Sequence, residues 1–143
     1  MGKRRRLIGG KARQRSRRGS SLVEAIIGFV VIIPIGLAAV DVATLVSAGQ
    51  TNEQVAEQAA RAAACQRSVN GAQKAAEESV EQTQTSNIIT QVSLDTVNYD
   101  PTMGQVTVST VMQVRMPVPL PFLTTFDLKA TEMQPIVAFP ASI

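Results

Sequence analysis

The chain has 143 residues, enough for one modest domain, and a formal charge of +3. It contains no histidine and a single cysteine, Cys65. Ordinary histidine-based zinc sites, Ser–His catalysis and an intramolecular disulfide are therefore excluded. The charge is unevenly divided, because residues 1–19 hold nine Lys/Arg and no acid, whereas the remainder holds five basic and eleven acidic residues. Such asymmetry indicates a basic tail that contacts an anionic surface or fixes membrane orientation.

An apolar stretch follows this basic leader. From residue 22 to residue 46 the only charges are Glu24 and Asp41. With its polar ends, the stretch reaches the roughly 20 residues that a helix needs to cross a ~30 Å hydrocarbon core. Glu24 and Asp41 are about 25 Å apart along a helix at ~1.5 Å per residue, so we expect them near opposite interfaces, where a charge costs less than at mid-membrane. Pro34 lies between them and is tolerated in a membrane helix.

The leader predicts the orientation of this span. Basic residues beside an apolar helix hold that end in the cytoplasm, and Arg13, Arg15, Arg17 and Arg18 are the nearest here. We therefore expect the acidic remainder on the far side. A basic segment also suits nucleic-acid phosphates. This leader lacks aromatic residues for stacking and is fused to an apolar span, so we expect membrane lipid and no nucleic acid as its partner.

Two helices are predicted beyond the span. Residues 50–68 contain no Gly or Pro and many good helix formers. Their narrow face of mostly small side chains favours packing of helix against helix and consists of Val55, Ala59, Ala62, Ala63 and Gln66. Asn70-Gly71 predicts the end of this helix, and residues 72–83 predict a second, acidic one. A lone cysteine on an alanine-rich helix, such as Cys65, is expected to be a small buried apolar residue.

The period then changes to that of strands. Residues 88–97 and 105–116 predict an antiparallel hairpin around a turn at 100–104, with Val106, Val108, Val111 or Met112, and Val114 on one face. Residues 117–121 hold three prolines and predict an extended linker, and residues 126–133 alternate as a third strand. The predicted fold is thus α+β: a long N-terminal helix, transmembrane in its first half, followed by a small domain with two or three antiparallel strands. The segments are a leader (1–19), a transmembrane helix (20–49), a helical segment (50–86) and an extracytoplasmic strand-rich domain (87–143).

Three fates are open to the N-terminal segment. It stays as an uncut anchor, or it is cut after the apolar run, where Val46-Ser47-Ala48 resembles a secretory cleavage site. The third fate is cleavage before the run, between Gly19 and Ser20. That cut would create an ammonium on Ser20, four residues before Glu24, which would neutralise the carboxylate within a helix bundle. From the residues alone, this pairing and simple solvation of Glu24 by headgroups both stay open.

The order of these features is similar to that of a known family. Gly19 followed by an apolar helix with Glu at the fifth position resembles the leader of type IV pilin-like proteins. Arg18-Gly19, Val23-Glu24, Pro34, Asp41 and the Ala-Arg-Ala-Ala run at 60–63 together resemble the TadE/TadG-like family of minor pilins or pseudopilins of the tight-adherence (Flp) system. The similarity covers roughly residues 17–64. Ala25 departs from it, because the family commonly has Phe there.

The resemblance implies a structural function without catalysis, cofactor or metal. A prepilin peptidase would cut after Gly19, and Glu24, Pro34 and Asp41 would serve recognition or assembly. The partners would be that peptidase, other pilin or pseudopilin subunits, the Tad machinery and lipid. The protein would be a single-pass protein of the inner (cytoplasmic) membrane, with its N-terminus cytoplasmic and its C-terminus outside. Whether it enters a pilus stays open, as do two alternatives: an uncut anchor with a partner-binding outer domain, and a secreted domain released after Ala48.

Overall fold

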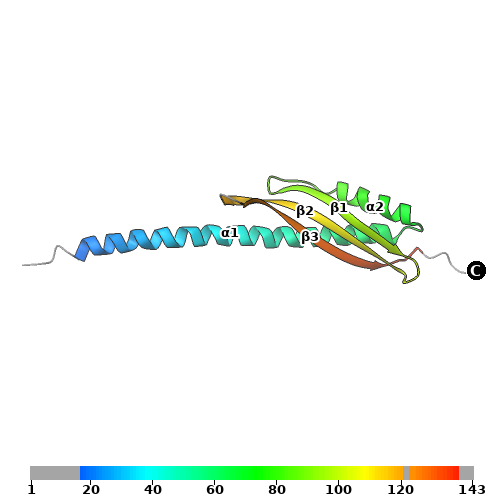
Figure 1. Ribbon diagram of the computed structural model, residues 1–143, viewed down its shortest axis with the longest axis horizontal. Coiled ribbons are helices and arrows are strands. Elements are labelled where there is room, and N and C mark those ends of the chain that lie inside the picture. The colour runs from blue at the N-terminus through cyan, green and yellow to red at the C-terminus, as the bar shows by residue number, and fades with distance from the viewer. Residues whose placement is uncertain (1–16, 121–122, 139–143) are drawn as a thin grey trace, which may run out of the picture. The chain divides into compact units, whose positions relative to one another are not determined.

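The computed structural model describes residues 17–120 and 123–138. In chain order its elements are helix α1 (Arg17–Ala64), helix α2 (Val69–Glu81) and strands β1 (Ile89–Asp100), β2 (Gln105–Leu120) and β3 (Leu123–Pro135) (Figure 1). A long helix followed by a small antiparallel sheet confirms the predicted α+β fold. The chain divides into two compact units, residues 1–36 and 37–143, and α1 contributes to both.

The described part of the first unit is the N-terminal portion of α1. Its large apolar side chains are exposed, among them Leu22, Ile26, Phe29, Ile32 and Ile35. An 18-residue window of α1 has a mean hydropathy of 2.5 with none of it buried, so the helix is long and apolar enough to cross a membrane. Pro34 lies within α1 without ending it, although its missing N–H leaves the carbonyl of Val30 without its helical donor.

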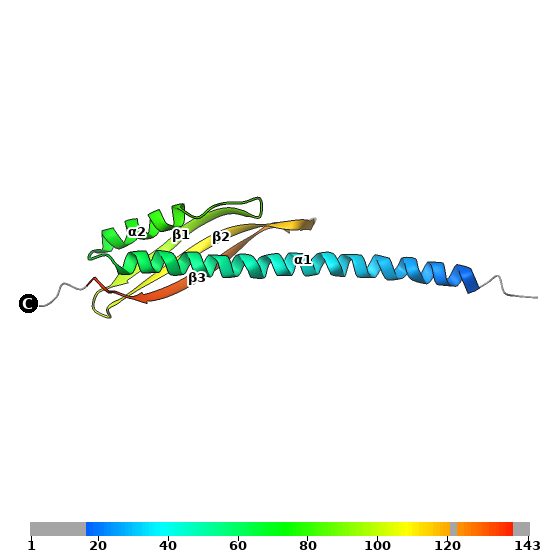
Figure 2. The ribbon, with the colours of Figure 1, turned by 180° about the vertical axis from the view of Figure 1, so that it is seen from behind.

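The second unit is built on a three-stranded sheet in the order β1-β2-β3, with both pairs antiparallel. Alternate side chains of the central strand β2 point into the core, which confirms the predicted face of Val106, Val108, Met112 and Val114. The C-terminal part of α1 and the buried face of α2 complete this core (Figure 2). Helix α2 lies along β1 in both views.

The alanine-rich face of α1 is a core face, which corrects the sequence interpretation. Val55, Ala59 and Ala63 are buried in the same cluster as the inward side chains of β2. The buried residues of α2 belong to the same cluster. The expectation of a face reserved for another helix was therefore wrong at these positions.

The break between the helices also differs from the prediction. Helix α1 ends at Ala64, and α2 begins at Val69 and runs through Asn70-Gly71. Ser68 is the N-cap of α2, and its Oγ accepts a hydrogen bond of 3.1 Å from the backbone N–H of Gly71. Cys65 lies in the turn and is exposed, so the expectation that it is buried was wrong.

The proline segment extends β2 instead of forming a linker. Strand β2 continues through Pro117 and Pro119 to Leu120, where it pairs with Leu123 of β3. The ladder between β2 and β3 is nevertheless irregular between Arg115 and Leu120. This agrees with the missing amide donors of proline, which cannot contribute to a ladder.

Candidate functional site

The predicted cleavage site lies in the first turn of α1. Gly19 and Ser20 are helical, two and three residues after the helix begins at Arg17. Amides in a first turn have no carbonyl acceptor within the helix, so this turn opens more readily than the interior. Arg17 and Arg18 precede the site in the same turn, whereas Arg13 and Arg15 lie outside the described residues.

Glu24 and Pro34 lie on the exposed apolar portion of α1. Glu24 is exposed and is the first acid of the helix, one turn beyond Ser20. Pro34 follows ten residues later, inside the continuous helix. Both side chains are therefore on the exposed surface of the apolar helix.

Asp41 has a different environment from the other predicted site residues. It is only 4% exposed, and its Oδ1 accepts a hydrogen bond of 3.1 Å from the backbone N–H of Val118 in β2. Pro117 and Pro119 flank Val118 and have no N–H, so Val118 supplies the one amide donor of these three residues. Asp41 is thus a buried group that links the irregular end of β2 to α1.

Asn52 is a second polar link between α1 and the sheet that sequence reasoning missed. It is 1% exposed; its Nδ2 donates to the carbonyl of Leu128 in β3 at 2.8 Å, and its Oδ1 accepts from the hydroxyl of Thr110 in β2 at 2.9 Å. Asp41 and Asn52 are eleven residues apart, close to three helical turns, and therefore face the same side. The sequence signal for this buried face was the helical spacing of Asp41, Ala48, Asn52 and Val55, which places all four on one side of the helix.

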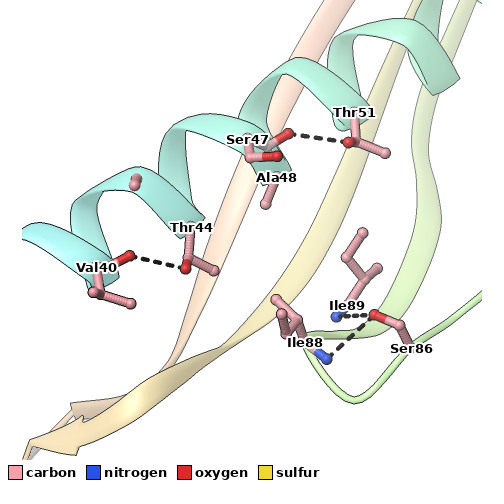
Figure 3. Close-up of a pocket in the computed structure, with 9 residues that line it drawn as sticks. Val40, Thr44, Ser47, Ala48, Thr51, Ser86, Ile88 and Ile89 are labelled. Carbon is pink, nitrogen blue, oxygen red and sulfur yellow. Dashed lines mark hydrogen bonds between the residues drawn. The ribbon is translucent and has the colours of Figure 1, made fainter.

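A groove runs beside α1 within the second unit. It encloses about 450 Å³ between α1 and the connection that leads into β1 (Figure 3). The helix contributes Val40, Ala43, Thr44, Ser47, Ala48 and Thr51, the connection contributes Ser86 and Ile88, and β1 contributes Ile89. Thr51 also lines a second, amide-rich groove of about 310 Å³ between α1 and α2, with Gln54, Gln58 and Gln82 among its walls.

Three of the four hydroxyl groups of the first groove, those of Thr44, Thr51 and Ser86, form hydrogen bonds within the chain. Thr44 Oγ1 donates to the carbonyl of Val40 at 2.9 Å, and Thr51 Oγ1 donates to that of Ser47 at 3.0 Å. Ser86 Oγ accepts from the backbone N–H groups of Ile88 at 3.2 Å and Ile89 at 3.0 Å (Figure 3). The groove therefore presents mainly methyl and methylene groups, and few polar atoms are left for a polar ligand.

Within residues 17–120 and 123–138 no group of three metal-binding side chains comes together.

A scan against protein-family models finds no matching model, and searches of curated proteins and of solved structures find no match. The features that bear on function in the described residues are the predicted junction at Gly19–Ser20, the exposed apolar part of α1 that carries Glu24, and the folded unit.

Proposed function

We propose that this protein is a structural minor pilin or pseudopilin of a Tad-type assembly or secretion system, processed by a prepilin peptidase after Gly19. It acts without catalysis or cofactor, and its partners are the peptidase, other pilin-like subunits and the assembly machinery. It lies in the inner membrane as a single span, with its basic leader cytoplasmic and its folded unit outside. The resemblance of residues 17–64 to the TadE/TadG-like family supports this proposal.

The observation that carries the proposal is that α1 contributes both an exposed apolar surface and core residues of the folded unit. Its early part exposes a continuous apolar surface, and its later part supplies core residues of the folded unit. One helix thus contributes to both the exposed apolar stretch and the folded unit. This suits a subunit that is assembled from the membrane and keeps its apolar helix.

The same feature bears on the secreted alternative. The bond after Ala48 lies inside α1, and Ala48 is itself a buried core residue. Cleavage there would require unwinding of the helix and would remove a core side chain from the released domain. This argues against release after Ala48. The other alternative, an uncut anchor with a partner-binding outer domain, differs from the proposal in the fate of Gly19–Ser20 and in the role of the folded unit.

Processing is tested on the protein isolated from its native membrane. We expect intact-mass and N-terminal analysis to find a chain that starts at Ser20. A start at Met1 or Gly2 would support the uncut anchor, and a start at Gly49 the secreted domain.

A substitution at the junction sharpens this test. Gly19→Arg places a bulky charged side chain at the cleaved bond, and we expect the full-length chain to accumulate in the membrane. Gly49→Ala is a matched control, because no atom lies within 4 Å of the position its Cβ would take. Unchanged processing of Gly19→Arg would overturn the proposed cleavage.

A further inference from the structure

The polar links between α1 and the sheet fix the direction in which β2 runs along the helix. Asn52 accepts from the hydroxyl of Thr110 at 2.9 Å. Asp41, earlier in the helix, accepts from the amide of Val118, later in the strand. Within the second unit β2 therefore runs back toward the apolar side of α1 (Figure 1). The end of the sheet at residues 115–118 and 124–127, which we call the proximal end, lies on the Asp41 side of Asn52.

The proximal end has charges only at its border. Arg115 is the only charged residue of β2, Asp127 is the first of β3, and the sequence between them holds none. Arg115 pairs with Thr125 and Gln113 with Asp127, so these four residues share the outer face of the sheet. Arg115 and Asp127 are both exposed, as is Pro117. The proximal end thus combines an uncharged extremity with an exposed arginine behind it.

Arg115 has no acidic partner among the residues that the structure describes. The ion pairs formed by those residues are Arg61–Glu57, Lys74–Glu78 and Lys129–Asp95. Asp127 on the neighbouring strand accepts instead from Nε2 of Gln113 at 3.4 Å. The guanidinium of Arg115 is therefore free to bind an anion from outside the chain, and its planar set of N–H donors matches the oxygens of a phosphate group.

The level of the proximal end matches that of lipid headgroups if α1 spans a membrane. Glu24 and Asp41 are about 25 Å apart along the helix at ~1.5 Å per residue, so a ~30 Å hydrocarbon core that begins near Glu24 ends close to Asp41. Headgroup regions add about 5–7 Å on each side. Arg115 precedes Val118 by three residues, about 10 Å at ~3.3 Å per residue, on the side away from the hydrocarbon. Its long side chain is thus expected to reach the headgroups.

We infer that the proximal end of the sheet rests on the headgroup layer of the membrane that α1 spans, with the Arg115 guanidinium bound to a phospholipid phosphate. The inference rests on the membrane insertion contained in the proposed function. The hydroxyl of Thr125, opposite Arg115 on the same face, adds a second donor beside the phosphate. This contact orients the folded unit on the membrane surface.

Quenching by headgroup-labelled lipid tests the inference on the full chain. In a Cys65→Ser background, bimane is attached to Thr124→Cys at the proximal end or to Met103→Cys in the β1–β2 turn, at the opposite end of β2. The protein is reconstituted in phosphatidylethanolamine/phosphatidylglycerol vesicles that contain phosphatidylcholine with a nitroxide on its headgroup. We expect quenching at Thr124 that is several-fold stronger than at Met103.

A third label separates this inference from the membrane insertion. Val30 is an exposed residue of the apolar part of α1, and bimane on Val30→Cys should be quenched by acyl-chain doxyl phosphatidylcholine. Quenching at Val30 with Thr124 no more quenched than Met103 would overturn the headgroup contact and leave the membrane span standing. Absence of quenching at Val30 would overturn the membrane insertion itself, and with it the inference.

Substitution of Arg115 distinguishes a phosphate contact from simple proximity to lipid. We expect Arg115→Gln to reduce the headgroup quenching at Thr124 at least twofold without changing the acyl-chain quenching at Val30. Arg67→Gln removes the same charge from an exposed arginine in the break between α1 and α2 and serves as the matched control. Equal quenching at Thr124 in the Arg115→Gln protein and its parent would contradict a phosphate bound to Arg115.

Discussion

At the scale of single residues, the fold depends on two buried polar side chains of α1. Asn52 uses both ends of its amide, one toward each of two strands, and Asp41 accepts the amide of a strand end. Buried polar groups destabilise a fold unless they are paired. Each of these side chains therefore specifies how the helix sits on the sheet, which the surrounding alanines do only loosely.

Replacement of Asn52 tests this role. Asn52→Ala leaves the Thr110 hydroxyl and the Leu128 carbonyl without their partner, and we expect the free energy of unfolding to fall by about 1–3 kcal/mol. Thermal or urea unfolding of the full chain in detergent micelles, followed by circular dichroism, measures the change. Gln50→Ala, an exposed change two residues away, should stay within about 0.5 kcal/mol. Equal stabilities of the two variants would show that the Asn52 bonds contribute nothing net.

Cys65 offers a second test at this scale. Because it is exposed in the turn after α1, we expect a maleimide reagent to label the folded protein almost as fast as the unfolded one. A Cys65→Ser, Val55→Cys protein moves the thiol to a buried position and should be protected at least tenfold. Slow labelling at Cys65 in the folded protein would argue that this turn is covered.

At the scale of elements, the link between Asp41 and Val118 joins α1 to the end of β2. The prolines on either side of Val118 have no N–H, so this strand end has few amide donors for pairing with β3. The Asp41 carboxylate supplies a hydrogen bond that holds this strand end in place of the missing sheet bonds. The link thus compensates locally for an irregular pairing between β2 and β3.

Hydrogen exchange measures this link directly. In Asp41→Ala the Val118 amide loses its acceptor, and we expect its exchange to accelerate at least tenfold, since no ladder bond replaces the lost one. Asp41→Asn keeps an oxygen acceptor at the same place and should change the rate much less. Exchange at Val106, far along the same strand, is the internal reference. Similar rates at Val118 in all three proteins would mean that the strand end is held by other contacts.

The elements were predictable where their signal is local. The alternation of Val106, Val108, Met112 and Val114 is a period of two, and it placed β2 and its buried face. The helix break was misplaced because Asn-Gly is a usual stop, whereas here Ser68 caps a new helix that includes both residues. The roles of Asp41 and Asn52 could not be predicted from local patterns. The partner of Asp41 lies 77 residues away in sequence, and the two partners of Asn52 lie 58 and 76 residues away.

At the scale of the whole molecule, one helix supplies both an exposed apolar stretch, long enough to cross a membrane, and part of the folded core. Substitutions in its two parts should therefore have separable effects. Changes on the exposed apolar part should affect insertion and assembly, whereas changes among the buried alanines should affect stability. The proposed role of Glu24 belongs to the first class, since the side chain is exposed and distant in sequence from every core residue.

Glu24→Ala tests that role in cells. After cleavage the Ser20 ammonium would lose its carboxylate partner one turn away, and we expect incorporation into sheared pilus-like material to drop several-fold while membrane levels persist. Immunoblotting of sheared and membrane fractions measures both. Glu53→Ala removes another exposed acid, from the later part of α1, and should leave incorporation unchanged. Wild-type incorporation of Glu24→Ala would remove the assembly role of this carboxylate.

The lone tyrosine gives the protein an internal optical reporter. The chain has one tyrosine and no tryptophan, and the Tyr99 hydroxyl donates a 2.9 Å hydrogen bond to the carbonyl of Gln66. That bond ties the end of β1 to the turn between α1 and α2. The tyrosine absorption and emission of the unlabelled protein therefore originate at one junction of helices and sheet. A change in the tyrosine spectrum during unfolding would report when those elements separate, without any dye.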